Sequence, residues 1–316
     1  MSSSTPPVLS TFTLPDTTPT IPVTHPQSII TQDQILAFPA FKAWLSTLQK
    51  SLSLQTTRPR HPFKDHPYAL RSIEIQSADF FSSHRLGFLK LRATITNDQD
   101  EHLPGSVFMR GGSVAMLIIL QPTPTTTTIS SDDDDDDAAA PTRRSTDEAE
   151  EYVILTVQPR IAAGSLSFTE LPAGMIDDSG TFAGAAAKEI TEETGLEIST
   201  GDLLDMTQLA IDTGTATSSM QQDQDQDGDT DQHLQKAMYP SPGASDEFIP
   251  VFLARRSMAR DEIESLRGKL TGLRDHGEKI TLNVVPVSDV WKVAARDAKT
   301  LAAMALYQGL KADGRI

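Results

Sequence analysis

The residues from Glu170 to Leu196, ELPAGMIDDSGTFAGAAAKEITEETGL, constrain this chain more than any other stretch. Glu189, Glu192 and Glu193 stand at positions i, i+3 and i+4, so a helix would place them on one face. Three like charges on one face repel one another unless a cation lies between them. Oxygen ligands in this arrangement suit Mg²⁺, which proteins typically hold with one or two carboxylates, waters and substrate phosphates. The stretch therefore predicts a metal site for phosphate chemistry.

Glycines and apolar residues around these glutamates follow a fixed pattern, a glycine and then R-E-apolar-x-E-E-x-G-apolar. The positions that fit it are Gly174, Glu189, Ile190, Glu192, Glu193, Gly195 and Leu196. The segment thus resembles the box that defines the Nudix hydrolases. Two positions depart from that box, because Gly180 stands where it has a glutamate and Lys188 where it has an arginine. Lysine keeps the charge but lacks the planar fork that braces carboxylates, so we expect them to be held less firmly.

Several segments outside the box are similar to the branch of Nudix enzymes that splits ADP-ribose and ADP-glucose, the plant-type ADP-sugar diphosphatases. They are GFLK at Gly87, RG at Arg110, QPRI at Arg160, ELPAGM at Glu170, YPSPG and SDE between Tyr239 and Glu247, and GKLTGLRDHGE from Gly268 to Glu278. The resemblance implies Mg²⁺-dependent hydrolysis of the diphosphate linkage of a nucleoside diphosphate sugar, ADP-glucose or ADP-ribose, to AMP and a sugar phosphate. A UDP-sugar diphosphatase and a catalytically weak Nudix-fold nucleotide-binding module are the alternatives.

The metal site that we expect combines side chains of the helix with the turn before it. Glu189 and Glu193 are the first choices as ligands of Mg²⁺, with Mn²⁺ as a substitute metal. Glu192 is either a third ligand or a catalytic contact to metal-bound water. The resemblance adds the backbone carbonyl of Ala173 as a further ligand.

Other residues receive a role from the resemblance alone. Arg110 and Arg160 match arginines near the substrate, and guanidinium forks suit phosphate oxygens, although a surface ion pair is the alternative for each. Glu247 resembles a substrate or metal contact. Carboxylates that hold a metal are poor bases, and the residue that matches the family's catalytic base is Glu278, with the neighbouring His276 as the alternative.

Composition limits the class of protein. The chain has 316 residues, 38% of them apolar and none of them cysteine, which excludes disulfides and thiolate zinc sites and fits a reducing compartment. The longest apolar run, Val114 to Leu120, is far shorter than the roughly 20 residues that cross a bilayer. No lysine or arginine precedes Lys42, so the amino end matches neither a secretory signal nor an arginine-rich transit peptide. We expect a soluble, cytoplasmic protein with no membrane partner.

The formal net charge of -16 argues against a nucleic-acid partner. Most of it comes from two stretches, because Asp132 to Glu151 carries -8 and Thr213 to Met238 carries -4. The rest of the chain is close to balanced. That balance leaves room for a locally basic pocket that receives an anionic substrate.

The amino-terminal third predicts a tail and a small subdomain. Residues 1–33 mix Ser, Thr and Pro with few large apolar groups, which is typical of a disordered tail. Residues 34–106 predict a short helix, interrupted by Pro39, and a small antiparallel β subdomain. Its strands are SIEIQSADF and RLGFLKLRATIT, which alternate apolar and polar residues around a turn at Ser82 to His84.

Residues 107–316 predict the catalytic domain, with an α/β (α+β) fold of Nudix type, an α/β/α sandwich around a mixed sheet. Strands are expected at SVAMLIIL, YVILTVQPR, DLLDMTQLAIDT, Phe248 to Leu253 and ITLNVVPV. One helix is expected near the carboxyl end, starting at Ser288 or Asp289. Disordered insertions are expected at about 122–150 and 213–238, the first joining two neighbouring strands.

The amino-terminal subdomain also bears on assembly. It carries more apolar residues than a two-stranded piece can cover, so it needs a further packing surface. Enzymes of the resembled branch are commonly homodimers whose amino-terminal sheets complete the partner's substrate pocket. The resemblance therefore implies a homodimer.

Overall fold

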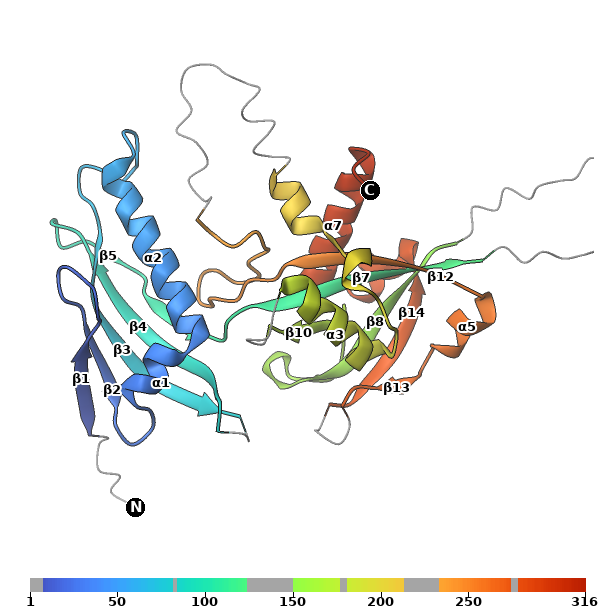
Figure 1. Cartoon of the computed structure of the whole chain (residues 1–316), viewed down its shortest axis with the longest axis horizontal. Helices are drawn as coiled ribbons and strands as arrows, with labels where there is room; N and C mark the ends of the chain where they lie inside the picture. Colours follow the sequence, from blue (N-terminus) through green and yellow to red (C-terminus); the bar gives the residue numbers. More distant parts are fainter. Residues whose placement is uncertain (1–7, 82–83, 124–149, 177–180, 213–232, 274–277) are drawn as a thin grey trace, which may run out of the picture. The chain divides into compact units, whose positions relative to one another are not determined.

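The computed structural model describes residues 8–81, 84–123, 150–176, 181–212, 233–273 and 278–316 (Figure 1). The chain divides into two compact units. The first unit comprises Met1–Val114, Met175–Gly180 and Thr207–Pro250, and the second comprises Ala115–Gly174, Thr181–Met206 and Val251–Ile316. The segment 207–250, which the sequence assigns to the catalytic domain, is thus grouped with the amino-terminal unit.

The first unit is built on a mostly antiparallel sheet, which in the described residues has six strands in the order β1-β2-β3-β4-β5, with β6 also pairing with β4. The strands are β1 (Leu9–Thr13), β2 (Pro22–Pro26), β3 (Ala69–Phe80), β4 (Leu86–Thr96), β5 (His102–Leu103) and β6 (Ser106–Met109). The long hairpin of β3 and β4 confirms the two strands expected there. Along β4, buried residues alternate with more exposed ones, as the sequence pattern predicts for a sheet with one covered face.

Two helices pack on this sheet, where the sequence predicted one short interrupted helix. α1 (Gln32–Ala37) begins with a capping box, in which the Thr31 hydroxyl accepts from the Gln34 amide and the Gln34 side chain accepts from the Thr31 amide. α2 (Pro39–Thr57) is a separate helix of 19 residues with its proline at the first position, where a backbone N–H would have no intrahelical acceptor in any case. Proline therefore starts the second helix here.

The tail expected at residues 1–33 is wrong for the described part, which begins at residue 8. β1 and β2 pair along their whole length, and β2 continues into a parallel pairing with β3 through Val23 and Ile73. Some apolar residues of this segment lie in the core, where Leu14, Ile21 and Ile30 are buried, whereas Val8 and Leu9 are exposed. The low average hydrophobicity of this segment therefore did not reveal that a few of its residues belong to the core.

The second unit is carried by a mixed sheet. Among the described residues it has eight strands in the order β11-β12-β7-β8-β14-β13, with β10 pairing with β7 and β9 with β8. The strands are β7 (Ser113–Pro122), β8 (Tyr152–Arg160), β9 (Ser165–Glu170), β10 (Ala173–Met175), β11 (Leu204–Asp205), β12 (Val251–Met258), β13 (Leu270–Thr271) and β14 (Ile280–Pro286). β7 is buried almost throughout and runs parallel to β12. Its antiparallel pairing with β8 confirms that the first insertion joins neighbouring strands.

The helices of this unit follow local signals in the sequence. They are α3 (Phe182–Thr194), α5 (Arg260–Ser265), α6 (Val290–Val293) and α7 (Ala298–Ala312), with short 3₁₀ turns η1 (Ile161–Ala163), η2 (Thr200–Asp202) and η4 (Val287–Asp289). The single terminal helix expected from Ser288 or Asp289 is wrong, because α6 ends at Val293 and a separate helix, α7, follows. α7 starts anew where the Asp297 carboxylate accepts from the Thr300 amide.

The strand expected at DLLDMTQLAIDT is also largely wrong. Only Leu204–Asp205 is extended, and residues 206–212 are helical. Met206 and Ala210 lie four residues apart, a spacing that places two residues on one face of a helix and equally on one face of a strand. The stretch was too short for periodicity to decide.

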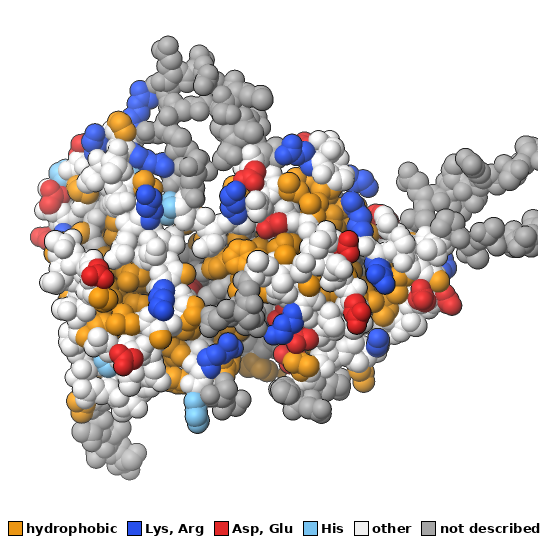
Figure 2. Space-filling view, in the orientation of Figure 1, with side chains coloured by type: hydrophobic (Ala, Val, Ile, Leu, Met, Phe, Trp, Pro, Cys, Tyr) orange, Lys and Arg blue, Asp and Glu red, His pale blue; other side chains and the backbone are white. Residues whose placement is uncertain are grey.

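The surface carries charges of both signs. On the face of the second unit seen in Figure 2, basic and acidic side chains are interspersed. This agrees with the near balance of charge outside the two acidic stretches. Among the described helices, none is both long and apolar enough to cross a membrane.

Candidate functional site

The helix predicted to carry the three glutamates is α3, in the second unit. The Thr181 hydroxyl caps it by accepting from the Gly184 amide at 3.1 Å. Gly195 ends it with a φ of 75°, a left-handed conformation that glycine adopts without strain. The last glycine of the box pattern therefore ends the helix, the first, Gly174, lies in β10, and Glu189, Glu192 and Glu193 lie on the helix between them.

Gly174 meets Glu189 directly. A Cβ built on Gly174 would lie 1.7 Å from the Glu189 carboxyl carbon and 2.0 and 2.2 Å from its two oxygens. The glutamate thus packs its carboxylate against the backbone of the turn, and a residue without a side chain is needed opposite it. The fixed distance between these two residues in the sequence has this contact as its physical reason.

Glu193 is buried beside the same turn, with 5% of its surface exposed. Its Oε2 accepts from the Ala173 amide at 3.0 Å, and its Oε1 accepts a longer bond of 3.5 Å from Gln158 of β8. Burial, and then the nearby charge of Glu189, raise the pKa of Glu193 to about 8. A buried carboxylate next to a second one is a place where a cation is favoured.

Glu192 is half-buried on the same helix. Within the described residues, no three acidic, histidine or cysteine side chains are grouped closely enough to hold a metal ion. A metal at this turn would therefore depend on Glu189 and Glu193 with other oxygen donors, and the role of Glu192 stays a prediction. Lys188 is exposed, and Gly180 lies outside the described residues.

Arg160 extends from the end of β8 toward the start of the turn. Its Nε donates to the Glu170 carboxylate at 2.5 Å, and Glu170 is itself buried. The Arg160 side chain is 41% exposed, so it makes this ion pair while remaining accessible to solvent. The structure thus gives Arg160 the ion pair that the sequence left as its alternative, and its contact with substrate stays a prediction.

Arg110 and Glu247 lie together in the first unit. An Arg110 nitrogen, Nη1, pairs with Glu247 Oε1 at 2.9 Å, and the same oxygen accepts from the Ser113 hydroxyl at 2.9 Å. The Arg110 Nε is buried and has no hydrogen-bond partner among the described groups. Two residues predicted separately as substrate contacts are therefore neighbours, and one retains an unused donor.

Asp246, which the sequence reasoning missed, holds the loop that carries Glu247. Its carboxylate accepts from the Arg110 amide at 2.8 Å and from the Gly111 amide at 3.1 Å. Burial raises the pKa of Asp246, while these backbone bonds act in the opposite direction. The signal was its place inside the SDE segment, next to Glu247.

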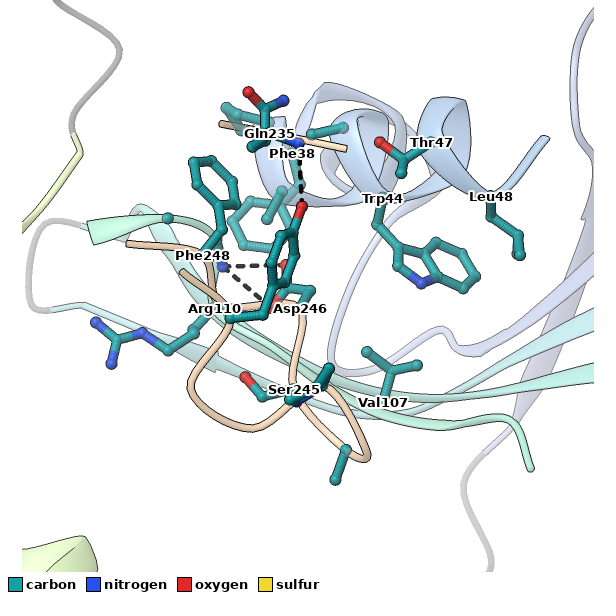
Figure 3. Close-up of a pocket in the computed structure, with 18 of the residues that line it drawn as sticks. Phe38, Trp44, Thr47, Leu48, Val107, Arg110, Gln235, Ser245, Asp246 and Phe248 are labelled. Carbon is teal, nitrogen blue, oxygen red and sulfur yellow. Dashed lines mark hydrogen bonds between the residues drawn. The ribbon is translucent and has the colours of Figure 1, made fainter. Parts of the chain in front are cut away.

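A pocket of about 720 Å³ opens beside this loop, entirely within the first unit (Figure 3). Its lining includes Phe38, Trp44, Arg110, Tyr239, Asp246 and Phe248. The side chain of Trp44 projects from α2 into the space above Val107, and the Arg110 guanidinium points away from it. The volume and the aromatic walls are those of a small-molecule site.

Glu278, the predicted general base, is exposed two residues before β14 in the second unit. Its Oε2 accepts from the Leu273 amide at 3.1 Å, and its own amide donates to the Leu273 carbonyl at 3.3 Å. The glutamate thereby closes a short loop, and the alternative base, His276, lies outside the described residues. Its catalytic role stays a prediction.

Comparison with known proteins identifies the family. A model of the NUDIX domain matches residues 138–304. The chain is also 32% identical over 278 residues to Nudix hydrolase 14, chloroplastic, of Arabidopsis thaliana, covering 87% of this chain and 72% of the relative. The protein belongs to the Nudix family.

A solved structure titled as that of an ADP compounds hydrolase also aligns with this Nudix protein. It covers 78% of this chain and 99% of the other, with a TM-score of 0.39 and 14% identity. The assignment to the family rests on the domain match and the plant relative. Both make this Nudix protein a hydrolase.

Proposed function

We propose that this Nudix hydrolase cleaves the diphosphate linkage of a nucleoside diphosphate sugar, ADP-glucose or ADP-ribose, and releases AMP and a sugar phosphate with the help of Mg²⁺. The observation that carries the proposal is the close packing of two carboxylates, Glu189 and Glu193, against the turn at Ala173 and Gly174. Such a cluster of oxygens with excess negative charge suits a hard divalent cation.

The residues present fit Mg²⁺, or Mn²⁺ in its place. Glu189 and Glu193 supply carboxylate oxygens, and the Ala173 carbonyl is the further donor that we assign. The bonds that Glu193 accepts from Ala173 and Gln158 use only part of its acceptor capacity, since each carboxylate oxygen has two lone pairs. A divalent cation bound there would neutralise the diphosphate and lower the pKa of water.

The reaction adds water across one phosphoric anhydride. The oxygen of water forms a bond to one phosphorus, the bond from that phosphorus to the bridging oxygen breaks, and the bridging oxygen leaves with the other phosphate. The water gives up a proton as it attacks, and we assign Glu278 as the base that accepts it, with His276 as the alternative. Glu192 is assigned to a contact with the water or the cation.

The choice of an ADP sugar rests on the separated segments that resemble the ADP-sugar diphosphatases. Within the first unit, the pocket beside Arg110 adds support, because aromatic side chains such as Trp44 and Phe248 suit a planar ring. Arg110, Arg160 and Glu247 are assigned as substrate contacts. We also propose a homodimer in the cytoplasm, with no nucleic-acid or membrane partner.

A panel of nucleotide sugars tests the function. The purified protein is incubated with Mg²⁺ and ADP-glucose, ADP-ribose, UDP-glucose or other nucleotide sugars, and the products are separated by chromatography. We expect AMP and the sugar phosphate from the ADP sugars. Faster release of UMP would favour the UDP-sugar diphosphatase, and binding without products would favour the catalytically weak module.

A further inference from the structure

The turn from Glu170 to Gly174 is held at every residue. In its second half, the Pro172 carbonyl accepts from the Met116 amide of β7 at 3.0 Å. The Ala173 amide donates to Glu193, and Gly174 packs on the Glu189 carboxylate. The segment from Pro172 to Gly174, which includes the metal ligand that we assign, is therefore fixed by β7 and by the carboxylates of α3.

The first half of the turn is fixed by the start of α7, near the other end of the sequence. The Leu171 amide donates to Asp297 Oδ2 at 3.2 Å and to the Thr300 hydroxyl at 3.1 Å. Lys299 donates both to the Glu170 carboxylate and, at 2.9 Å, to Asp297 Oδ1. Glu170 and Leu171 are thus both held by contacts with the start of α7.

These contacts form a chain of alternating charges that is largely buried from Glu170 to Asp297 and reaches solvent at Arg160. In order it runs through Arg160, Glu170, Lys299 and Asp297, with ion pairs between neighbours. The side chains of Glu170 and Asp297 are 3% and 7% exposed, and that of Lys299 is 11% exposed. Buried charges persist when each has a partner of opposite sign, and this chain supplies one to every member.

The position of Lys299 is not explained by the stability of its own helix. It lies in the first turn of α7, where the partial positive charge of the helix end disfavours a cation. Asp297 already caps that helix end, so α7 does not need a lysine there. The ion pair with Glu170 gives Lys299 a role outside α7, in the turn.

We propose that Lys299 and Asp297 are positioning residues that fix the turn from Glu170 to Gly174 in the shape that binds the metal ion. The proposal rests on the proposed function, because it takes the Ala173 carbonyl and Glu193 as metal ligands. Lys299 orients Glu170, Asp297 orients the Leu171 amide, and the two together limit how far Ala173 can move. The metal site would then depend on residues more than a hundred positions away in the sequence.

Metal binding without substrate tests the proposal directly. Free Mn²⁺ is titrated into the metal-free protein and its binding is followed by electron paramagnetic resonance. We expect Lys299→Met to weaken Mn²⁺ binding by about tenfold, the scale on which outer partners of metal sites act, and to raise the Mg²⁺ concentration that half-saturates activity by a similar factor. Lys299→Arg, which keeps the charge, should recover most of the affinity.

Two further variants separate positioning from stability. Lys292→Met removes a lysine of α6 from its exposed ion pair with Asp289 of η4, and it should leave Mn²⁺ affinity unchanged. Thr300→Val removes the hydroxyl that contacts Leu171, whereas Thr300→Ser keeps it, so only the valine variant should weaken Mn²⁺ binding. This pair decides the question if Lys299→Met does not fold.

The outcomes distinguish this proposal from the proposed function. Folded Lys299→Met and Thr300→Val proteins that bind Mn²⁺ like the wild type, even with a lower Tm, would overturn the positioning role while the hydrolase assignment stands. Weaker Mn²⁺ binding in both variants, in a wild type that cleaves no nucleotide sugar, would support the positioning role and remove the proposed substrate. A wild type that binds no Mn²⁺ would overturn both.

Discussion

The carboxylate of Glu189 lies in the space that a side chain at position 174 would occupy. The atoms that a Cβ on Gly174 would meet are the far end of a flexible side chain, so Gly174→Ala can be accommodated if Glu189 moves away. We therefore expect this variant to fold with nearly the wild-type Tm but to lose activity by about tenfold or more, since even small displacements of catalytic groups are costly. Steady-state kinetics and thermal unfolding check the two halves of this prediction.

A matched control for that variant is Gly201→Ala. Among the described residues beyond its two chain neighbours, no atom lies within 4 Å of a Cβ built on Gly201, so the added methyl should change neither activity nor Tm. Wild-type kinetics in Gly174→Ala would show that the position of Glu189 does not matter for the reaction.

Glu193→Gln separates the charge of the buried carboxylate from its shape. The amide oxygen of glutamine can still accept from the Ala173 amide, and a permanently neutral group avoids the cost of burying a carboxyl group whose pKa the site raises to about 8. We expect the metal-free variant to be at least as stable as the wild type in thermal unfolding. Its Mg²⁺-dependent activity should fall by at least about 100-fold, beyond the usual effect of an outer partner.

Chelation provides the control for the glutamine variant. The wild type in excess chelator should lose activity to a similar level and recover it when Mg²⁺ is restored. Unchanged turnover, either in the variant or in chelator, would rule out a metal held by Glu193.

Arg110 tests whether the first unit contacts substrate. Its buried Nε lacks a partner among the described groups, and an unused buried donor is costly unless a ligand or water accepts from it. Arg110→Lys keeps a positive charge near Glu247 but removes that donor. We expect KM for the nucleotide sugar to rise by about tenfold, the effect of roughly one lost hydrogen bond to a charged group, with a smaller change in kcat.

The corresponding control is Arg71→Lys in β3, an exposed arginine of the same unit whose Nε donates to Thr96. It should leave KM unchanged. If Arg110→Lys lowers the Tm and leaves KM at the wild-type value, the arginine serves only its ion pair with Glu247.

The parts of the site that the sequence predicted are those whose residues are close in the chain. The helix carrying Glu189 and Glu193 follows from spacing over a few turns, and Gly195 follows from the need for a left-handed residue at a helix end. The buried strand β7 follows from an uninterrupted apolar run. A pattern within a short stretch of sequence is enough in each case.

The parts that the sequence did not predict depend on distant partners. β2 is a strand because it pairs with β3, through Val23 and Ile73, across about fifty residues. Lys299 and Asp297 are joined to Glu170 and Leu171 across 129 and 126 positions. Nothing in the local sequence distinguishes Lys299 from an ordinary surface lysine, and its burial becomes visible only in the folded chain.

The homodimer is tested by the mass in solution. The first unit exposes Phe108, 46% accessible, whose ring stacks on that of Phe88 with 5.6 Å between the ring centroids, so the pair offers an apolar surface to a second subunit. We expect light scattering at micromolar concentration to give about twice the monomer mass of 34.3 kDa. A monomeric mass with full activity would show that the site does not require a second subunit.

The identity of the general base is tested by Glu278→Gln and His276→Gln. The Glu278 side chain accepts from the Leu273 amide, and glutamine can keep that bond through its amide oxygen, so the loop closure should survive while the basic carboxylate is lost. We expect kcat to fall by about 10²- to 10⁴-fold, the usual contribution of a positioned base, with Mn²⁺ binding and Tm unchanged. His276→Gln should retain most of the activity. The opposite pattern, with kcat lost in His276→Gln and kept in Glu278→Gln, would transfer the role to the histidine and leave Glu278 as the residue that closes its loop.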